Sequence, residues 1–370
     1  MSGPLAGVRV IELAAIGPAP FAGMLLADLG AEVIRIDRPL PDPGYEAMHS
    51  VLNRGRRRMT LDLKSAQGVS VVRRLAQSAD ILTEGFRPGV AERLGIGPAE
   101  LLADNPALVY GRMTGWGQHG PLATAAGHDI GYIALSGALA PLVGSDGVPV
   151  PPLNMLGDFG GGGMLLAVGV LAALQHARAT GEGQVVDAAI VDGAALLTAM
   201  HQAMRAIGAW SAPPGHNLFD GGAPYYGVFR TRDDKFLSVG AIEPQFYRLL
   251  LDGLGLTDVD PATQNDQSTW PLLRTRVAGR IAERTRDEWM AVFGGTDACV
   301  APVLEPGEAL ADAHLASRST YVEQDGVQHP APAPRFSATP TQLHSAGGED
   351  ETEKILAEIG WDSTPSKDRS

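Results

Sequence analysis

Residues 7–39 read GVRVIELAAIGPAPFAGMLLADLGAEVIRIDRP, and this stretch decides the fold class. The apolar run at 7–13 predicts a strand, residues 17–30 predict a helix that ends at Gly30, and residues 31–39 predict a second strand. The helix does not open with G-x-G-x-x-G, so the usual dinucleotide-binding fingerprint is absent. The alternation continues with a helix at 65–79 and strands at 80–86 and 107–117. We therefore expect a doubly wound, Rossmann-like α/β domain.

The chain changes character at a Pro/Gly-rich connector, SAPPGHNLFDGGAPYY (211–226). Such a composition marks a domain boundary. A hairpin pattern follows, with its turn near Asp233 and Asp234, and then three helices. One of these helices begins with a capping box from Thr285 to Glu288. The second part of the chain therefore predicts a smaller domain that mixes helices with antiparallel strands.

Composition excludes several classes of protein. The 370 residues carry a net charge of −13, which argues against nucleic acid as a partner. The single cysteine excludes an internal disulfide framework, and no histidines have the close spacing of a zinc site, so we expect no metal. The apolar run from Met164 to Leu174 is shorter than the ~20 residues of a membrane span, and no targeting segment is visible. We expect a cytoplasmic protein that does not bind membranes.

Two glycine-rich segments hold the candidate catalytic residues: GHDIGY (127–132) and PPLNMLGDFGGGGM (151–164). Each glycine in regular structure costs roughly 0.5–1 kcal/mol relative to alanine, so four in succession at 160–163 indicate that something approaches the backbone, and a ligand is our expectation. Asp158 precedes the expected helix and is equally well explained as an N-cap or as a catalytic acid. A lone histidine is usually structural, but His128 stands beside Asp129 in a segment that we interpret as a glycine-held loop.

Basic residues cluster after the second predicted strand, at Arg38, Arg54, Arg56, Arg57 and Arg58. The simpler interpretation of each is a solvated charged loop. However, open α/β sheets bind ligands at the carboxyl ends of their strands, so the cluster also fits a phosphate-bearing ligand.

Six motifs together carry a resemblance to a known family. They are RMTGWGQHGP (112–121), AGHDIGYIALSG (126–137), PPLNMLGDFGGG (151–162), GQVVDAAIVDG (183–193), GGAPYY (221–226) and VGAIEPQFY (239–247). In this order they resemble the α-methylacyl-CoA racemases, a branch of the family III CoA-transferase superfamily. The resemblance runs from Gly3 to about Arg335.

The resemblance implies a particular domain organisation. A large CoA-binding α/β domain would comprise residues 1–188 and 325–370, a linker helix and connector 189–220, and a small α+β domain 221–324. Two such subunits would interlock as a homodimer, so that each active site combines the large domain of one subunit with the small domain of the other.

The resemblance also assigns site residues. His128 and Asp158 would be the two acid/base residues, Asn154 and Asp129 would orient them, and Glu243 of the small domain would support His128. Arg38 would contact a CoA phosphate. The rest of the CoA channel would be formed by Thr60, Leu61, Asp62, Leu63, Glu84, Arg87, Gly127, Ile130, Gly131 and Tyr132. The family usually has Asn where this chain has Gly131, which implies a looser loop or a different acyl pocket.

The implied reaction is racemisation of 2-methyl-branched acyl-CoA thioesters by 1,1-proton transfer through an enolate, with no cofactor beyond the CoA of the substrate. A thioester acidifies its α-carbon, and histidine, with a usual pKa near 6.5, can act as acid or base, whereas aspartate needs burial to raise its pKa. The alternative is a CoA-transferase in which Asp158 is the nucleophile. A CoA-binding protein without turnover is a third, less favoured hypothesis. His128 and the Glu243 segment favour the racemase.

Overall fold

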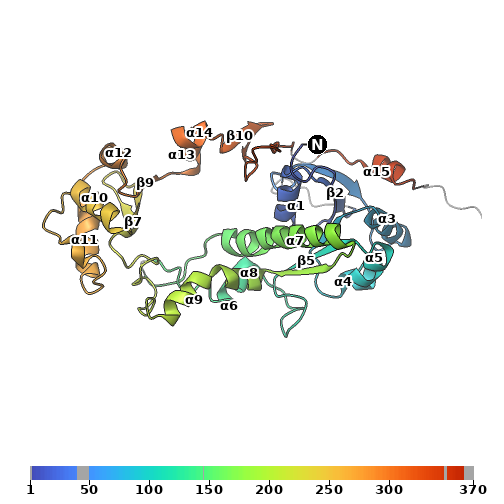
Figure 1. Cartoon of the computed structure of the whole chain (residues 1–370), viewed down its shortest axis with the longest axis horizontal. Helices are drawn as coiled ribbons and strands as arrows, with labels where there is room; N and C mark the ends of the chain where they lie inside the picture. The colour runs from blue at the N-terminus through green and yellow to red at the C-terminus, as the bar shows by residue number, and fades with distance from the viewer. Residues whose placement is uncertain (1, 40–49, 145, 346–347, 362–370) are drawn as a thin grey trace, which may run out of the picture. The chain divides into compact units, whose positions relative to one another are not determined.

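The computed structural model describes residues 2–39, 50–144, 146–345 and 348–361 (Figure 1). The chain divides into two compact units. Unit 1 comprises Met1–Ala138, Pro152–Leu197 and Tyr321–Ser370, and unit 2 comprises Leu139–Pro151 and Thr198–Thr320. Unit 1 takes in residues 189–197, which the sequence analysis assigns to a linker. The expected domain limits stay a prediction, and residues 362–370 of the expected large domain lie outside the described residues.

A six-stranded sheet, parallel at every pairing, forms the centre of unit 1. Its strand order is β3-β2-β1-β4-β5-β6. The strands are β1 (Arg9–Leu13), β2 (Glu32–Asp37), β3 (Arg56–Thr60), β4 (Ile81–Glu84), β5 (Val109–Thr114) and β6 (Val185–Ala189). This order confirms the doubly wound fold, and the order reverses between β1 and β4, where such sheets bind ligands.

Helices cover both faces of this sheet. One face packs against α1 (Pro18–Asp28) and α7 (Met164–Thr180), with Leu26, Leu166 and Val170 fully buried. The other face packs against α3 (Ala66–Ala76), α4 (Val90–Leu94) and α5 (Pro98–Asp104). The apolar positions on the two sides therefore form two separate cores, which is what a sheet buried on both faces requires.

The arginine cluster is mostly structural. Residues 56–60 form the edge strand β3, where the sequence analysis expects a loop. Three arginines of the cluster pair with carboxylates of the fold: Arg54 with Asp28 (2.5 Å), Arg56 with Glu12 (3.0 Å) and Arg58 with Asp37 (2.8 Å). The solvated-loop interpretation and the phosphate interpretation are both wrong for these three, because ion pairing within the fold satisfies their charge.

The C-terminal segment completes the β3 edge of unit 1. The backbone N–H of Glu351 donates to the Arg58 carbonyl at 2.8 Å, and the Thr60 N–H donates to Thr352 Oγ1 at 2.8 Å. Arg57 pairs with Glu351 at 3.0 Å and with Glu358 at 2.8 Å. Helix α15 (Thr352–Glu358) then places a fully buried side chain, Ile355, in the core beside α3.

A π-helix precedes α7 and extends it. This segment, η1 (Met155–Gly163), runs directly into α7, so a continuous helix spans Met155–Thr180. This helix is longer than the apolar run Met164–Leu174 predicts. It is the single helix among the described residues that is long and apolar enough to cross a membrane, by length and composition alone. Core helices of soluble proteins meet the same criterion, and α7 packs against β5, β6 and α1.

The glycine run has a structural explanation. A Cβ on Gly161 would lie 2.7 Å from the backbone N of Ala194 in α8 (Ile190–Leu197), and one on Gly163 would lie 2.6 Å from the Pro18 carbonyl at the start of α1. The expectation of a ligand at these glycines is therefore wrong. Two neighbouring helices occupy the space instead.

Unit 2 is an α+β arrangement around an antiparallel sheet. The sheet has the order β7-β8-β9, with β7 (Tyr226–Arg230), β8 (Phe236–Gly240) and β9 (Val300–Val303). The hairpin turn at Asp233 and Asp234 and the capping box at Thr285 and Glu288 are confirmed. The helices are α9 (Ala199–Ala206), α10 (Pro244–Leu254), η2 (Pro261–Thr263), α11 (Trp270–Ile281), α12 (Arg286–Phe293), α13 (Pro306–Ala311) and α14 (Ala313–Ser317).

The glycine contact between η1 and α8 makes a stability prediction. A Cβ on Gly193 would overlap the backbone of Gly161, and backbone atoms have no rotamer to escape into. Gly193→Ala should therefore destabilise the protein by about 3 kcal/mol, the upper end of typical overpacking effects. Thermal unfolding followed by circular dichroism measures the loss.

The matched control is Gly279→Ala in α11, where no atom lies within 4 Å of the added Cβ. This helical position should tolerate alanine or gain up to about 1 kcal/mol. Equal melting temperatures for Gly193→Ala and the unchanged protein would contradict the proposed backbone contact.

Candidate active site

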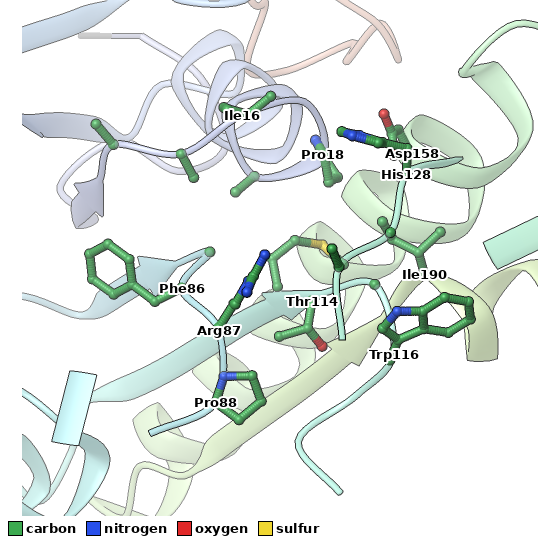
Figure 2. A pocket seen from close by; sticks show the side chains of 18 of the residues that line it. Ile16, Pro18, Phe86, Arg87, Pro88, Thr114, Trp116, His128, Asp158 and Ile190 are labelled. Atoms are coloured by element: carbon green, nitrogen blue, oxygen red, sulfur yellow. The ribbon is translucent and has the colours of Figure 1, made fainter. Parts of the chain in front are cut away.

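A cavity of about 660 Å³ opens at the carboxyl ends of β1, β2, β4 and β5 in unit 1. Figure 2 shows Ile16 and Pro18 on one side of it, Arg87 reaching into it, and His128 and Asp158 beside one another at one end. The cavity lies at the reversal of strand order, where open α/β sheets place their ligands. Its position alone makes it the candidate active site.

His128 enters the cavity from the start of a helix. The segment that the sequence analysis interprets as a loop is α6 (Asp129–Leu135), and His128 is its N-cap with extended backbone. Its side chain makes no capping hydrogen bond and is exposed to the cavity. The imidazole is therefore available to a ligand, because the helix does not use it.

Asp158 enters from the first turn of η1 and is not its N-cap. Asn154 is the N-cap of η1, and Asp158 lies within the first π-helical turn, where the Phe159 N–H donates to the Asn154 carbonyl at 3.3 Å. A Cβ on Gly17 would lie 3.2 Å from Asp158 Oδ2, so the glycine before α1 leaves room for this carboxylate. π-Helical turns are rare and are frequently found at functional sites.

Asp129 joins the two elements that carry His128 and Asp158. Its Oδ2 accepts the backbone N–H of Asp158 at 2.6 Å. Its Oδ1 is buried and has no hydrogen-bond partner among the described residues. A side chain at Gly157 would overlap this carboxylate, so glycine is required there. Asp129 thus fixes η1 to the start of α6 and keeps Asp158 close to His128.

The environment raises the pKa of Asp158. Burial is the largest cause, and the negative charge of Asp129 acts in the same direction. The Asn154 amide, which donates to Asp158 Oδ2 at 3.4 Å, and the nearby His128 partly oppose the shift. A raised pKa brings the titration of this carboxyl group closer to neutral pH. An acid/base residue needs this, because it must both accept and donate a proton.

The cavity also has a cationic part. Arg38 and Arg87 both line it, and no carboxylate partner is found for either within the part of the chain that the structure describes. Arg35 also lines it but pairs with Asp37 at 2.7 Å. Leu63 supplies an apolar contact beside these groups. Two unneutralised arginines at strand ends are suited to phosphate groups.

Several expected channel residues lie elsewhere. Thr60 Oγ1 donates to Asp350, Leu61 packs on the α3-side core, and Asp62 accepts the Lys64 N–H, so none of these side chains lines the cavity. Ile130 and Gly131 belong to α6 but also lie outside the lining, whereas Gly127 and Tyr132 form part of it.

Glu84 has a structural position instead of contact with the cavity. Its side chain is fully buried, accepts the Phe86 N–H at 2.5 Å and pairs with Arg112 at 3.0 Å. Burial raises the pKa of Glu84 to about 7 against the opposing effect of these two donors. The carboxylate therefore holds the loop from which Gly85, Phe86, Arg87 and Pro88 line the cavity.

Glu243 lies in unit 2 and is described there by itself. It is the exposed N-cap of α10, directly after β8, and makes no capping hydrogen bond through its side chain. Its expected support of His128 stays a prediction.

The apolar residues that form much of the cavity are not among the site residues expected from the sequence. They follow directly after strands: Ile16 and Pro18 after β1, Phe86 after β4, Trp116 after β5 and Ile190 after β6. The rule that ligands bind at the carboxyl ends of parallel strands is the signal that could have found them. No group of three His, Cys, Asp or Glu side chains suitable for a metal occurs in the described residues.

Comparison with known proteins identifies the family. The family model described as CoA-transferase family III matches residues 5–350. The chain belongs to CoA-transferase family III. The resemblance found in the six motifs is thereby confirmed.

Curated relatives within this family are close. The α-methylacyl-CoA racemase of Mus musculus is 45% identical over 362 residues, covering 96% of this chain and 93% of that protein. The Homo sapiens racemase is 44% identical, covering 96% and 94%. The succinyl-CoA–L-malate CoA-transferase alpha subunit of Chloroflexus aurantiacus is 30% identical, covering 93% and 85%. A solved CaiB/BaiF family protein of Brucella suis aligns with a TM-score of 0.82 at 26% identity over 97% of this chain and all of that one.

Substitution of Asp129 and substitution of Asn154 should shift the pKa of Asp158 in opposite directions. Asp129→Asn removes a negative charge, so the Asp158 pKa should fall. Asn154→Ala removes a hydrogen bond to the carboxylate, so the Asp158 pKa should rise. Titration of the ¹³C-labelled aspartate carboxyl carbons by NMR measures both shifts, and Asp158→Asn identifies the signal. Shifts of the same sign in the two variants would contradict this account of the site.

Proposed function

We propose that this protein is an α-methylacyl-CoA racemase, an isomerase that inverts the α-carbon of 2-methyl-branched acyl-CoA thioesters. One observation carries the proposal: His128 and Asp158, on two different elements tied together by Asp129, both open into one cavity that also holds Arg38 and Arg87. The identity of 44–45% with the two racemases over nearly the whole chain supports it.

The chemistry needs one base and one acid. One residue removes the α-proton, the electrons of the C–H bond form the C=C bond of an enolate, and the carbonyl oxygen takes the negative charge. The other residue then delivers a proton to the opposite face. His128 and Asp158 exchange these roles for the two epimers. No redox step occurs, so the proposal includes no cofactor beyond the CoA of the substrate.

The charges and apolar side chains of this cavity suggest where the parts of an acyl-CoA would bind. Arg38 and Arg87 would hold the phosphates, since both are free of carboxylate partners in the described part of the chain. The apolar residues Ile16, Pro18 and Trp116 would surround the acyl chain. A cytoplasmic location, without a nucleic-acid or membrane partner, remains part of the proposal.

The second candidate is a CoA-transferase with Asp158 as nucleophile. The 30% identity with the Chloroflexus transferase subunit and the position of Asp158 in the cavity favour it. An aspartyl nucleophile attacks the carbonyl carbon, whereas an acid/base residue reaches the hydrogen on the neighbouring α-carbon, at ~3 Å in either case. His128 beside Asp158 fits the second geometry, because a nucleophilic aspartate needs no paired base.

The racemase proposal predicts solvent exchange at the α-carbon. In D₂O, each epimer of a 2-methylacyl-CoA should gain deuterium as it is inverted. His128→Ala and Asp158→Asn should each slow α-proton removal from one epimer by about 100-fold more than from the other, because each residue serves one face. ¹H NMR together with chiral analysis of the released acid follows exchange and inversion in one sample.

The control is His119→Ala, an exposed histidine outside the cavity lining, which should leave both rates unchanged. A free carboxylic acid acceptor and hydroxylamine in the same sample test the transferase. CoA on the acceptor, or an adduct trapped at Asp158, with no epimerisation would replace the racemase by the transferase.

A homodimer is the second part of the proposal, and an apolar surface of unit 1 supports it. Met155 of η1, Met164 and Val168 of α7, and Leu196 of α8 are each about half or more exposed although their helices pack together. Met164 and Val168 are four residues apart and share one helix face. A second copy of this chain would cover this surface, as the interlocked arrangement requires.

The dimer makes its own prediction. Val168→Glu places a charge on the apolar surface and should convert a dimer into monomer, with loss of activity, while Val327→Glu on the β10–β11 hairpin (Tyr321–Gln324 and Val327–Pro330) should not. Sedimentation velocity at several concentrations measures the mass. An active monomer of the unchanged protein would overturn the interlocked arrangement.

A further inference from the structure

The hydroxyl group of Tyr132 stands in the cavity without a protein partner. Tyr132 lines the cavity and is 8% exposed. Its Oη makes no hydrogen bond to any residue that the structure describes. Tyr132 Oη is not one of the buried side-chain atoms without a partner, so the hydroxyl is accessible from the cavity and free to bond with a ligand there.

The ring that carries this hydroxyl is held in place by two glycines. A Cβ on Gly127 would lie 2.6 Å from Cε1 and 3.0 Å from Oη of Tyr132, and one on Gly115 would overlap the end of the ring. The Trp116 ring also packs against the Tyr132 ring in an edge contact, with 4.6 Å between the ring centroids and an angle of 83° between the ring planes. Both glycines therefore serve the position of this one phenol, which cannot turn to another rotamer without leaving its slot.

Tyr132 and the acid/base pair line the same cavity. Tyr132 lies in the first turn of α6, and its backbone N–H donates to the carbonyl of the N-cap His128 at 3.3 Å. Burial raises the pKa of Tyr132, the charge of Asp158 raises it further, and Arg87 partly opposes both effects. The phenol therefore stays protonated at neutral pH and remains a neutral hydrogen-bond donor.

We infer that Tyr132 Oη donates a hydrogen bond to the carbonyl oxygen of the acyl-CoA thioester, and this inference rests on the proposed function. When the α-proton leaves, the C–H electrons form the C=C bond and the carbonyl π electrons move to oxygen. The phenol proton stays on Tyr132. The hydrogen bond strengthens as the oxygen becomes negative, which makes Tyr132 a catalytic residue that stabilises the enolate.

Tyr132→Phe is the direct test, because it keeps the ring, its contact with Trp116 and its fit between the glycines. Removal of one such donor should lower kcat for epimerisation by about 100-fold, with KM changed by less than about threefold. The α-deuterium exchange rate should fall in parallel with kcat. The matched control is Tyr110→Phe, whose hydroxyl donates to the Ile96 carbonyl at 3.0 Å outside the cavity and whose loss should leave kcat unchanged.

A binding measurement separates this role from a structural one and from the proposed reaction. Two probes are compared by calorimetry: a 2-methylacyl-CoA under conditions of rapid mixing, and the corresponding 2-methylalkyl thioether of CoA, which has no carbonyl oxygen. The thioether should bind the wild type and Tyr132→Phe equally, whereas the thioester should bind the variant more weakly, by up to about threefold, and react about 100-fold more slowly. Equal kcat in the two proteins, or an equal loss of affinity for both probes, would overturn the inference. If the wild type itself shows no exchange, the racemase proposal fails, and a thioester-specific loss of binding still decides the role of Tyr132.

Discussion

The backbone contact between η1 and α8 fixes the position of the acidic residue on which the site depends. Gly161 and Gly193 allow the two helices to touch main chain to main chain, and Gly163 allows the same helix to lie against the start of α1. The helix is π-wound over this stretch, which turns Asp158 toward Gly17 and the cavity. The Asp129 carboxylate then fixes the remaining freedom by accepting the Asp158 N–H. Close packing and catalysis therefore use the same glycine residues.

The cavity has a cationic part and an apolar part. Most other arginines near the strands of unit 1 form ion pairs with carboxylates of the fold. Arg54, Arg56 and Arg58 are neutralised by carboxylates of neighbouring strands and helices. Burying such pairs adds little net stability, but removing one partner of a pair would be costly. The arginines that remain for a ligand are those beyond the strand ends. A phosphate-rich group and an apolar acyl chain can thus occupy one continuous cavity without competing for the same contacts.

The fold could be predicted from local pattern, whereas several parts of the site could not. The β-α-β unit at 7–39 follows from apolar runs and from the helix end at Gly30, and its strands and helix lie within a few residues of the expected limits. Strand β3 could not be recognised, because four of its five residues are polar and Arg57 finds its partners 294 and 301 positions away. Helix α6 resembles a loop in sequence, since Gly127 and Gly131 flank its start. The family motifs pointed to His128 and Asp158, but no local rule could distinguish glycines that admit a ligand from glycines that admit a helix.

The return of the chain to β3 has a consequence for biosynthesis. The core beside α3 contains Ile355, and the β3 edge is bonded to Glu351 and Thr352, so the first unit to be translated is the last to be completed. Unit 2 is internal to the sequence of unit 1, and its own core and sheet are complete once β9 (Val300–Val303) has left the ribosome. Nascent chains therefore expose an unfinished sheet edge until Glu351 and Thr352 have left the ribosome, and a premature stop before Ile355 would remove a part of the core beside α3.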